Sequence, residues 1–205
     1  MKLNKLSSLL GAVLVVSAAA FSSSAFADSA VGAGGAPNTA AARLDFQITI
    51  PKVLRFRVGN ATAGTVDMIT FAPTAAQVGN ATPIVGAGGD LTAGVVTASV
   101  VANSGQVTIT AATLGALNDG GTNTIPWSQI TTTSAVLTSA TALAAPVIPL
   151  TGTGASVNAP APVANVTTAD ARWTYRYANT AVPAAGTYGG VNIRNGRVTY
   201  TASAP

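Results

Sequence analysis

The sequence predicts an all-β protein of antiparallel strands, arranged as a sandwich or a barrel. Two stretches, residues 44–58 and 171–177, alternate apolar and polar residues with a period of two, which is the pattern of strands with one buried face. Shorter runs rich in Val, Thr and Ile are separated by glycine, proline and asparagine turns, as in sandwiches and barrels. The sequence contains no helical pattern of useful length and no internal repeat.

The first 27 residues predict a cleaved export signal. A lysine-containing start is followed by an apolar stretch over residues 9–20 and by the small-x-small triplet Ala-Phe-Ala at 25–27. A membrane-spanning helix needs about 20 apolar residues, so the short stretch favours a signal cut before Asp28 over a membrane anchor. We therefore expect an exported protein of the periplasm, the cell surface or the extracellular space, without a membrane span in its mature chain.

The residue inventory excludes several classes of function. The chain has no cysteine and no histidine, so it lacks the residues for a Ser-His-Asp triad, a zinc site of the usual ligands or a histidine pH switch. After loss of Lys2 and Lys5 with the signal, eight basic residues face six aspartates, a net charge of +2, too small for a nucleic-acid partner. The sequence thus predicts a protein that is not an enzyme and binds no cofactor or metal, with a calcium ion in the loops near Asp90 or Asp119 as the alternative.

The remaining polar and aromatic candidates have structural interpretations. Asp90 and Asp119 lie in apparent loops without the dense acidic spacing of a calcium site, and aspartate is common in turns. Trp173, Tyr175 and Tyr177 share one face of a predicted strand. Large rings bury the most apolar area, so we expect this face to be core instead of a sugar-stacking platform.

The strongest pattern lies near the N-terminus, after a flexible tether over residues 28–42. Within the domain predicted for residues 43–205, the even positions 44 to 50 and 54 to 58 carry apolar residues, and the odd positions are mostly polar. Pro51 cannot donate a ladder hydrogen bond. We therefore expect two consecutive strands, or one kinked strand, with the even-numbered side chains buried.

The rest of the chain predicts further short strands. Residues 95–102 and 106–112 flank the turn Asn103-Ser104-Gly105 and predict a hairpin. A short strand is expected within residues 66–71, another that starts at Ile125-Pro126-Trp127 and runs into the Thr-rich stretch after Ile130, and an irregular crossing over residues 144–165. At the C-terminus, residues 191–193 and 198–202 flank Asn195-Gly196 and predict a second hairpin.

The segments RLDFQITI (43–50) and GTYGGVNIRNGRVTYTASAP (186–205) together resemble those of bacterial fimbrial subunits of the chaperone–usher pilin type. Gly189 or Gly190 and Tyr200 occupy roughly the places of the glycine and aromatic residue of the family's last strand. The resemblance implies a single immunoglobulin-like β-sandwich whose open groove receives a strand from the next subunit. The inserting side chains would be Leu44, Phe46, Ile48 and Ile50, and the C-terminal strand would carry Val198, Tyr200 and Ala202.

We therefore expect a structural, self-associating surface protein, a fimbrial or extracellular-matrix subunit that assembles through edge-strand pairing. Its expected partners are other copies or related subunits, with a periplasmic chaperone implied by the resemblance. The alternative is a soluble β-sandwich module, periplasmic or secreted, that binds glycan or protein. Low charge at the strand-forming ends favours assembly, because charged edges are one way in which monomers avoid it.

Overall fold

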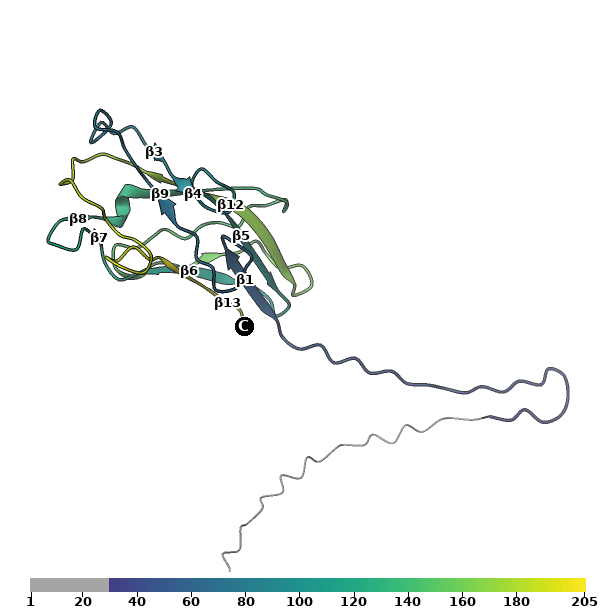
Figure 1. The fold of residues 1–205 in the computed structure, drawn as a ribbon. Helices are drawn as coiled ribbons and strands as arrows, with labels where there is room; N and C mark the ends of the chain where they lie inside the picture. The colour runs from purple at the N-terminus through teal and green to yellow at the C-terminus, as the bar shows by residue number, and fades with distance from the viewer. Residues whose placement is uncertain (1–29) are drawn as a thin grey trace, which may run out of the picture. The chain divides into compact units, whose positions relative to one another are not determined.

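A computed structural model describes residues 30–205, so the predicted signal at 1–27 lies outside the described residues. The chain divides into two units between Thr49 and Ile50, and every strand lies in the second (Figure 1). The six longer strands are β1 (Leu54–Val58), β5 (Val95–Ala102), β6 (Thr108–Thr113), β9 (Ile130–Ala135), β12 (Thr167–Tyr177) and β13 (Thr199–Ser203). The two-residue strands are β2 (Ile69–Thr70), β3 (Ile84–Val85), β4 (Ala87–Gly88), β7 (Leu117–Asn118), β8 (Thr124–Ile125), β10 (Gly152–Thr153) and β11 (Val157–Asn158), and one short 3-10 helix spans Trp127–Gln129.

The larger sheet is organised around β12. β12 pairs with β5 along residues 167–174 and with β9 along residues 172–177, on its opposite edge. β5 in turn pairs with β1, with Leu54 opposite Ala102 and Val58 opposite Ala98. The last two residues of β12 also pair with β3. All these pairings are antiparallel, which confirms the predicted class of sheet.

The second sheet is organised around β6. β13 pairs with one edge of β6 over residues 199–203, while the short strands β10 and β11 share the other edge. Two small ribbons, β2–β4 and β7–β8, complete the described strands.

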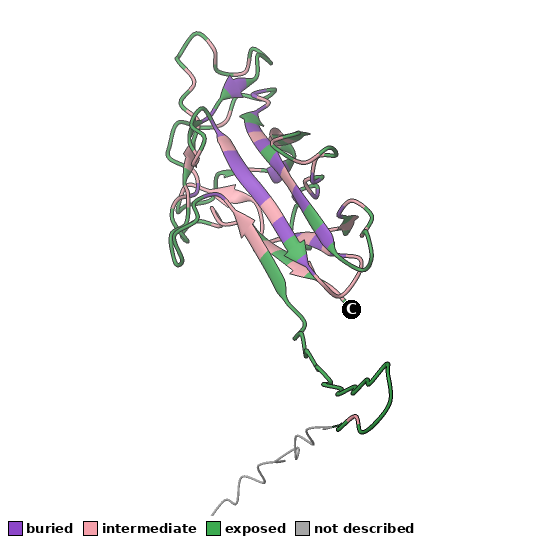
Figure 2. Cartoon of the chain, turned by 90° about the vertical axis from the view of Figure 1, so that its right-hand side faces the viewer, coloured by how far each residue is buried: buried purple, intermediate pink, exposed green. Residues whose placement is uncertain are grey.

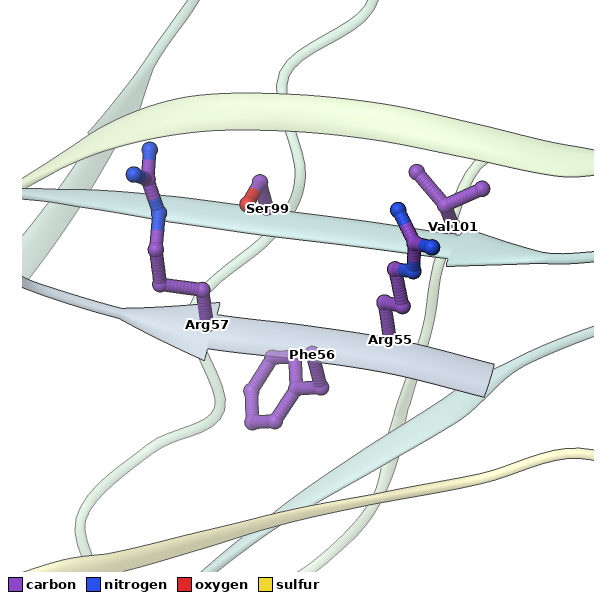
Figure 3. A pocket seen from close by; sticks show the side chains of 5 residues that line it. All are labelled: Arg55, Phe56, Arg57, Ser99 and Val101. Atoms are coloured by element: carbon purple, nitrogen blue, oxygen red, sulfur yellow. The ribbon is translucent and has the colours of Figure 1, made fainter. Parts of the chain in front are cut away.

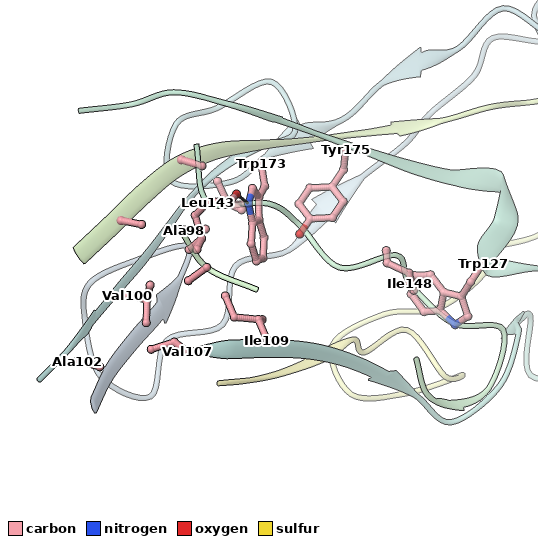
Figure 4. Packing of buried hydrophobic residues seen from close by; sticks show 14 residues of the cluster. Ala98, Val100, Ala102, Val107, Ile109, Trp127, Leu143, Ile148, Trp173 and Tyr175 are labelled. Atoms are coloured by element: carbon pink, nitrogen blue, oxygen red, sulfur yellow. Dashed lines mark hydrogen bonds between the residues drawn. The ribbon is translucent and has the colours of Figure 1, made fainter. Parts of the chain in front are cut away.

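The hydrophobic core receives side chains from both larger sheets (Figure 4). Trp173 of β12 is fully buried, as is Ile109 of β6. The rings of Trp173 and Tyr200, which belong to different sheets, lie 5.2 Å apart between centroids. The indole N–H of Trp173 donates to the carbonyl of Leu143 at 2.7 Å, so this buried ring leaves no unpaired donor.

The predicted alternation of residues 171–177 is confirmed and extends over the whole of β12. Its eleven residues alternate between buried and more exposed positions without a break (Figure 2). Trp173, Tyr175 and Tyr177 are all buried. They therefore form core, as expected, and offer no stacking surface.

The predicted hairpin over residues 95–112 is wrong in its pairing, although both strands exist. β5 lies in the larger sheet and β6 in the second, and they do not pair with each other. The turn is held by other segments: the N–H of Gly105 donates to Asn165 at 2.9 Å, and its carbonyl accepts from the hydroxyl of Thr167 at 2.7 Å. These contacts direct the chain from one sheet to the other.

The predicted C-terminal hairpin is also wrong. Residues 191–193 form no strand, and Val191 and Ile193 are exposed. Instead, the loop is tied to β7, since Asn118 donates to the carbonyl of Arg194 at 3.1 Å. β13 takes β6 as its partner, so the tight turn at Asn195-Gly196 closes a loop.

The two long segments between the main strands contain more structure than expected. The region over residues 144–165, predicted to be irregular, supplies β10 and β11 to the edge of β6. The short strand expected within residues 66–71 is β2, which pairs with β4.

The alternating N-terminal segment is a strand only in its second half, β1. Residues 44–50 form no strand, and their even-numbered side chains are exposed, from 69% for Leu44 to 85% for Phe46. The expectation that this face is buried within the chain is therefore wrong for residues 44–50 and for Leu54, which is 40% exposed, while Phe56 and Val58 are partly buried. Alternation leads to burial only where a partner strand is available, and no described segment pairs with these residues.

Candidate functional site

The outer edge of β13 has no partner strand. β13 pairs with β6 along one side, and no described segment makes a backbone hydrogen bond to its other side. Unpaired N–H and C=O groups on a strand edge are a template for pairing with another chain.

The outer edge of β1 is equally free among the described residues. β1 pairs with β5 along its full length and with no other strand. β1 and β13 lie near each other although they belong to different sheets (Figure 1). The two unpaired edges therefore occur on the same side of residues 50–205.

A row of incompletely covered apolar side chains accompanies these edges. Every second residue at the C-terminus is partly buried and packs against the core, and β1 contributes two similar side chains. The members are Phe56, Val58, Val198, Tyr200, Ala202 and Ala204. Partial burial at period two is what a strand face shows when one neighbour is missing. The predicted residues Val198, Tyr200 and Ala202 all lie in this row.

The predicted inserting residues Leu44, Phe46, Ile48 and Ile50 form a second apolar row, on residues 43–50, which we call the arm. All four are more than two-thirds exposed. The intervening odd positions are polar, namely Arg43, Asp45, Gln47 and Thr49. Exposed large apolar side chains arranged on one side of an extended segment are typical of an interaction surface.

The chain that follows the arm is fastened to the sheet by Asn103. Its side-chain amide donates to the carbonyl of Pro51 at 2.9 Å and accepts from the N–H of Val53 at 2.7 Å. The backbone N–H of Asn103 donates to the carbonyl of Val53 at 3.2 Å. One asparagine thus continues the β1–β5 ladder beyond its last paired residues and fixes where β1 begins.

Tyr200 links the half-covered row to the core. Its hydroxyl lies 2.9 Å from that of Tyr175, so the two side chains bridge the sheets. Burial raises the pKa of Tyr200 to about 12, although the hydrogen bond with Tyr175 opposes this rise. Burial, followed by the proximity of Tyr200, also raises the pKa of Tyr175. Both hydroxyls are therefore neutral at ordinary pH, and the pair is suited to packing and not to acid–base chemistry.

The aspartates have local structural partners. Asp119 accepts hydrogen bonds from the side chain of Asn123 and the N–H of Gly121, which lower its pKa. Asp90 accepts from the N–H of Thr97 at 2.7 Å. Within residues 30–205, no three acidic, histidine or cysteine side chains gather as metal ligands would.

Two further observations bear on partners. In the part of the chain that the structure describes, no helix is long and apolar enough to cross a bilayer. Comparison with protein-family models, with curated proteins and with solved structures finds no match to this chain.

Sequence reasoning named the arm residues and Val198, Tyr200 and Ala202 and expected edge-strand pairing, but it did not locate the free edges on β1 and β13 or the role of Asn103. Edges depend on strand order, which alternation does not encode. The asparagine sits in a motif that is equally typical of a hairpin turn, so no local signal distinguishes its clamping role.

Proposed function

We propose that this protein is an exported structural subunit that self-associates by adding the arm of one copy to the free edges of another. The proposal rests on one observation: the same chain has both an unpaired strand-like segment and a place where a strand is missing. Among residues 30–205, the alternating arm has no partner strand, and a half-covered apolar row lies beside unpaired strand edges. Strand addition satisfies both, because the backbone completes the ladder and alternate side chains fill the groove.

The strand order supports an immunoglobulin-like sandwich with a missing strand. In a constant-type immunoglobulin domain, strands A, B, E and D form one sheet and C, F and G form the other. Taken in chain order as A to F, the six longer strands pair as β1-β5-β12-β9 and β6-β13. The pairing therefore fits A-B-E-D and C-F. Strand G, which would pair with the free edge of β13, has no counterpart among residues 30–205.

The composition supports the same proposal. Arg43 and Asp45 are the charged residues of the arm, and its apolar side carries none. β13 contains no charged residue, which leaves its edge without the lysines or acids that commonly block edge pairing. The absence of cysteine means that no disulfide stabilises the subunit, so burial of the exposed rows by a neighbouring copy is a direct source of stability.

The decisive experiment compares two double variants of the arm that add the same charge. Phe46→Asp with Ile48→Asp places two carboxylates on the apolar side, whereas Gln47→Asp with Thr49→Asp places them on the polar side. Loss of two large apolar contacts, each worth roughly 1.5–3 kcal/mol when buried, should weaken self-association by roughly 10²- to 10⁴-fold. The polar-side variant should assemble like the unmodified chain. Light scattering after size exclusion, over a concentration series, and negative-stain imaging measure the outcome.

A peptide of residues 43–50 provides an independent check. It should bind a chain that begins at Ile50, while a peptide with aspartate at positions 46 and 48 should not. An unmodified chain that remains monomeric at all concentrations, together with an inert peptide, would refute the proposal.

A further inference from the structure

The exposed face of the larger sheet carries a cationic pocket that none of the preceding observations explains. Arg55 and Arg57 stand two residues apart on β1 and therefore on the same face of the strand. Both rise on the same side of the sheet in Figure 3. The register places Arg57 opposite Ser99 and Arg55 opposite Val101 on β5.

These side chains line an open pocket of about 270 Å³. Phe56, whose ring lies on the other side of β1, completes the lining (Figure 3). The pocket thus combines two guanidinium groups, a hydroxyl and an apolar wall from Val101.

Arg57 has an unmet hydrogen-bonding requirement. Its Nε atom is buried and has no hydrogen-bond partner among the described residues. Buried polar atoms are paired in the great majority of cases, and a specific exception calls for a missing ion, water or ligand as its partner. The guanidinium presents its donors as a planar fork that matches the oxygens of carboxylate, sulfate or phosphate.

Neither arginine is neutralised within residues 30–205, since no ion pair joins Arg55 or Arg57 to an acid there. The register brings Asp170 of β12 beside Ser99, on the side of β5 away from β1. However, the carboxylate of Asp170 accepts hydrogen bonds from the N–H groups of Thr138 and Ser139 and from the Thr138 hydroxyl. These three hydrogen bonds hold the carboxylate of Asp170 against the loop at 138–139.

We infer that this pocket binds the oxyanion of a phosphate or sulfate group. The fork of Arg57 would contact two of the oxygens, with Nε gaining its partner, while Arg55 and the Ser99 hydroxyl would contact the others. Val101 and the open side of the pocket leave room for a sugar that carries the group. This inference does not rest on self-association, because its anion-binding groups, on Arg55, Arg57 and Ser99, lie on the face of the sheet opposite to the ring of Phe56, which packs against the core.

The test is a titration of the purified protein with sodium phosphate, sulfate or acetate, with ionic strength held constant by sodium chloride. NMR signals of the Arg57 Nε–H and of the amides at residues 55–57 and 99–101 report binding. Phosphate and sulfate should give saturable shifts confined to these residues, and acetate, which has two oxygens, should give weaker ones. Glucose 6-phosphate tests the source of the anion: tighter binding than phosphate indicates a group on a sugar, and equal binding indicates the free ion.

Matched variants identify the residues responsible. Arg57→Gln should weaken phosphate binding about tenfold or more. Arg57→Lys should keep only part of the affinity of the unmodified protein, because an ammonium lacks the planar fork of donors. Arg55→Gln should also weaken binding, and because the Arg55 side chain is exposed, this variant leaves the core packing unchanged. Arg176→Gln is the control, since this exposed arginine lies on the same sheet face but on β12.

Shifts that stay linear in anion concentration would overturn the inference. So would an equal loss of affinity in Arg176→Gln and Arg55→Gln, because that result indicates attraction to the whole basic face without a defined site.

Discussion

At the scale of single residues, a buried amide fastens a long loop to the larger sheet. Asn179 is fully buried just after β12. Its Oδ1 accepts from the N–H of Gly79 at 2.9 Å, and its Nδ2 donates to the carbonyl of Gln77 at 2.6 Å. Its φ is +56°, a left-handed conformation that asparagine tolerates better than most residues. The carbonyl of Asn179 also accepts from the N–H of Ala81 at 3.0 Å, so this residue holds the loop at 77–82 with both its side chain and its backbone.

Asn179→Ala should therefore destabilise the protein by about 2–4 kcal/mol, because it leaves partly buried backbone groups of Gln77 and Gly79 unpaired and adds left-handed strain. Denaturant unfolding at neutral pH measures the loss. Asn192→Ala is a control for strain alone, since Asn192 has a φ of +57° and is exposed, with no side-chain hydrogen bond among the described residues. Similar losses in the two variants would show that the hydrogen bonds of Asn179 contribute little.

Asp170 makes stability depend on pH in the acid range. Its partial burial acts to raise its pKa, but hydrogen bonds from Thr138 and Ser139 outweigh this and lower it to about 2, from 3.8. A carboxylate with a lowered folded-state pKa stabilises the protein above about pH 3.8, and this contribution is lost as pH falls toward 2.

Unfolding followed between pH 5 and pH 1.5 should show a shallower acid loss in Asp170→Asn than in the unmodified protein. Asp45→Asn should follow the unmodified protein, because Asp45 lies in the exposed arm outside the compact unit. An identical acid profile for Asp170→Asn and the unmodified chain would count against this role of the loop at 138–139.

At the scale of elements, the contact between β12 and β13 joins the two larger sheets through a polar link in an apolar layer. Tyr175 and Tyr200 meet through their hydroxyls, and the ring of Tyr200 packs on Trp173. A hydrogen bond between neutral groups contributes about 0.5–1.5 kcal/mol. The link orients β13, whose outer edge is free.

Tyr200→Phe should thus cost about 1 kcal/mol at neutral pH, since it leaves the Tyr175 hydroxyl unpaired while preserving the ring. It should also flatten the alkaline profile. Unfolded tyrosine ionises near pH 10, whereas folded Tyr200 holds its proton to about 12, so stability is present below pH 10 and falls as pH rises toward 12. Unfolding midpoints at pH 7 and from pH 9 to 12 check both effects, and Tyr188→Phe provides a comparison outside the core.

At the scale of the whole molecule, sequence reasoning located the burial pattern and failed on pairing. The class of fold and the inward face of β12 followed from alternation, because a period of two directly reports which side chains avoid water. The two hairpins were wrong because a favourable turn specifies a reversal of the chain and not the sheet that each strand joins. In the arm, the sequence alternates as expected but the apolar side chains are exposed. Alternation does not say whether the partner strand belongs to the same chain.

For the candidate site, too, the sequence indicated which residues are apolar but not which segments lie beside them. Its apolar residues could be named from the sequence, whereas its free edges and the pocket at Arg55 and Arg57 depend on neighbours that lie 40 or more positions away, such as Ser99 and Val101. Charged residues alternating with Phe56 are an ordinary solvent face in sequence terms. Only the register between β1 and β5 shows that the hydroxyl of Ser99 lies beside Arg57.

The length and late position of β12 also determine when this chain can fold. β12 pairs with β5 across 65 to 79 positions of sequence, from Ala102–Thr167 to Val95–Thr174. Until residues 167–177 are available, β1 and β5 form only a two-stranded ladder, which is marginal in water. Such distant pairings carry a large loop-closure cost and slow the folding reaction. The chain therefore remains without its central strand until residues 167–177 have been made. Until then the edge of β5 stays open, and the chain is exposed to premature contacts between copies.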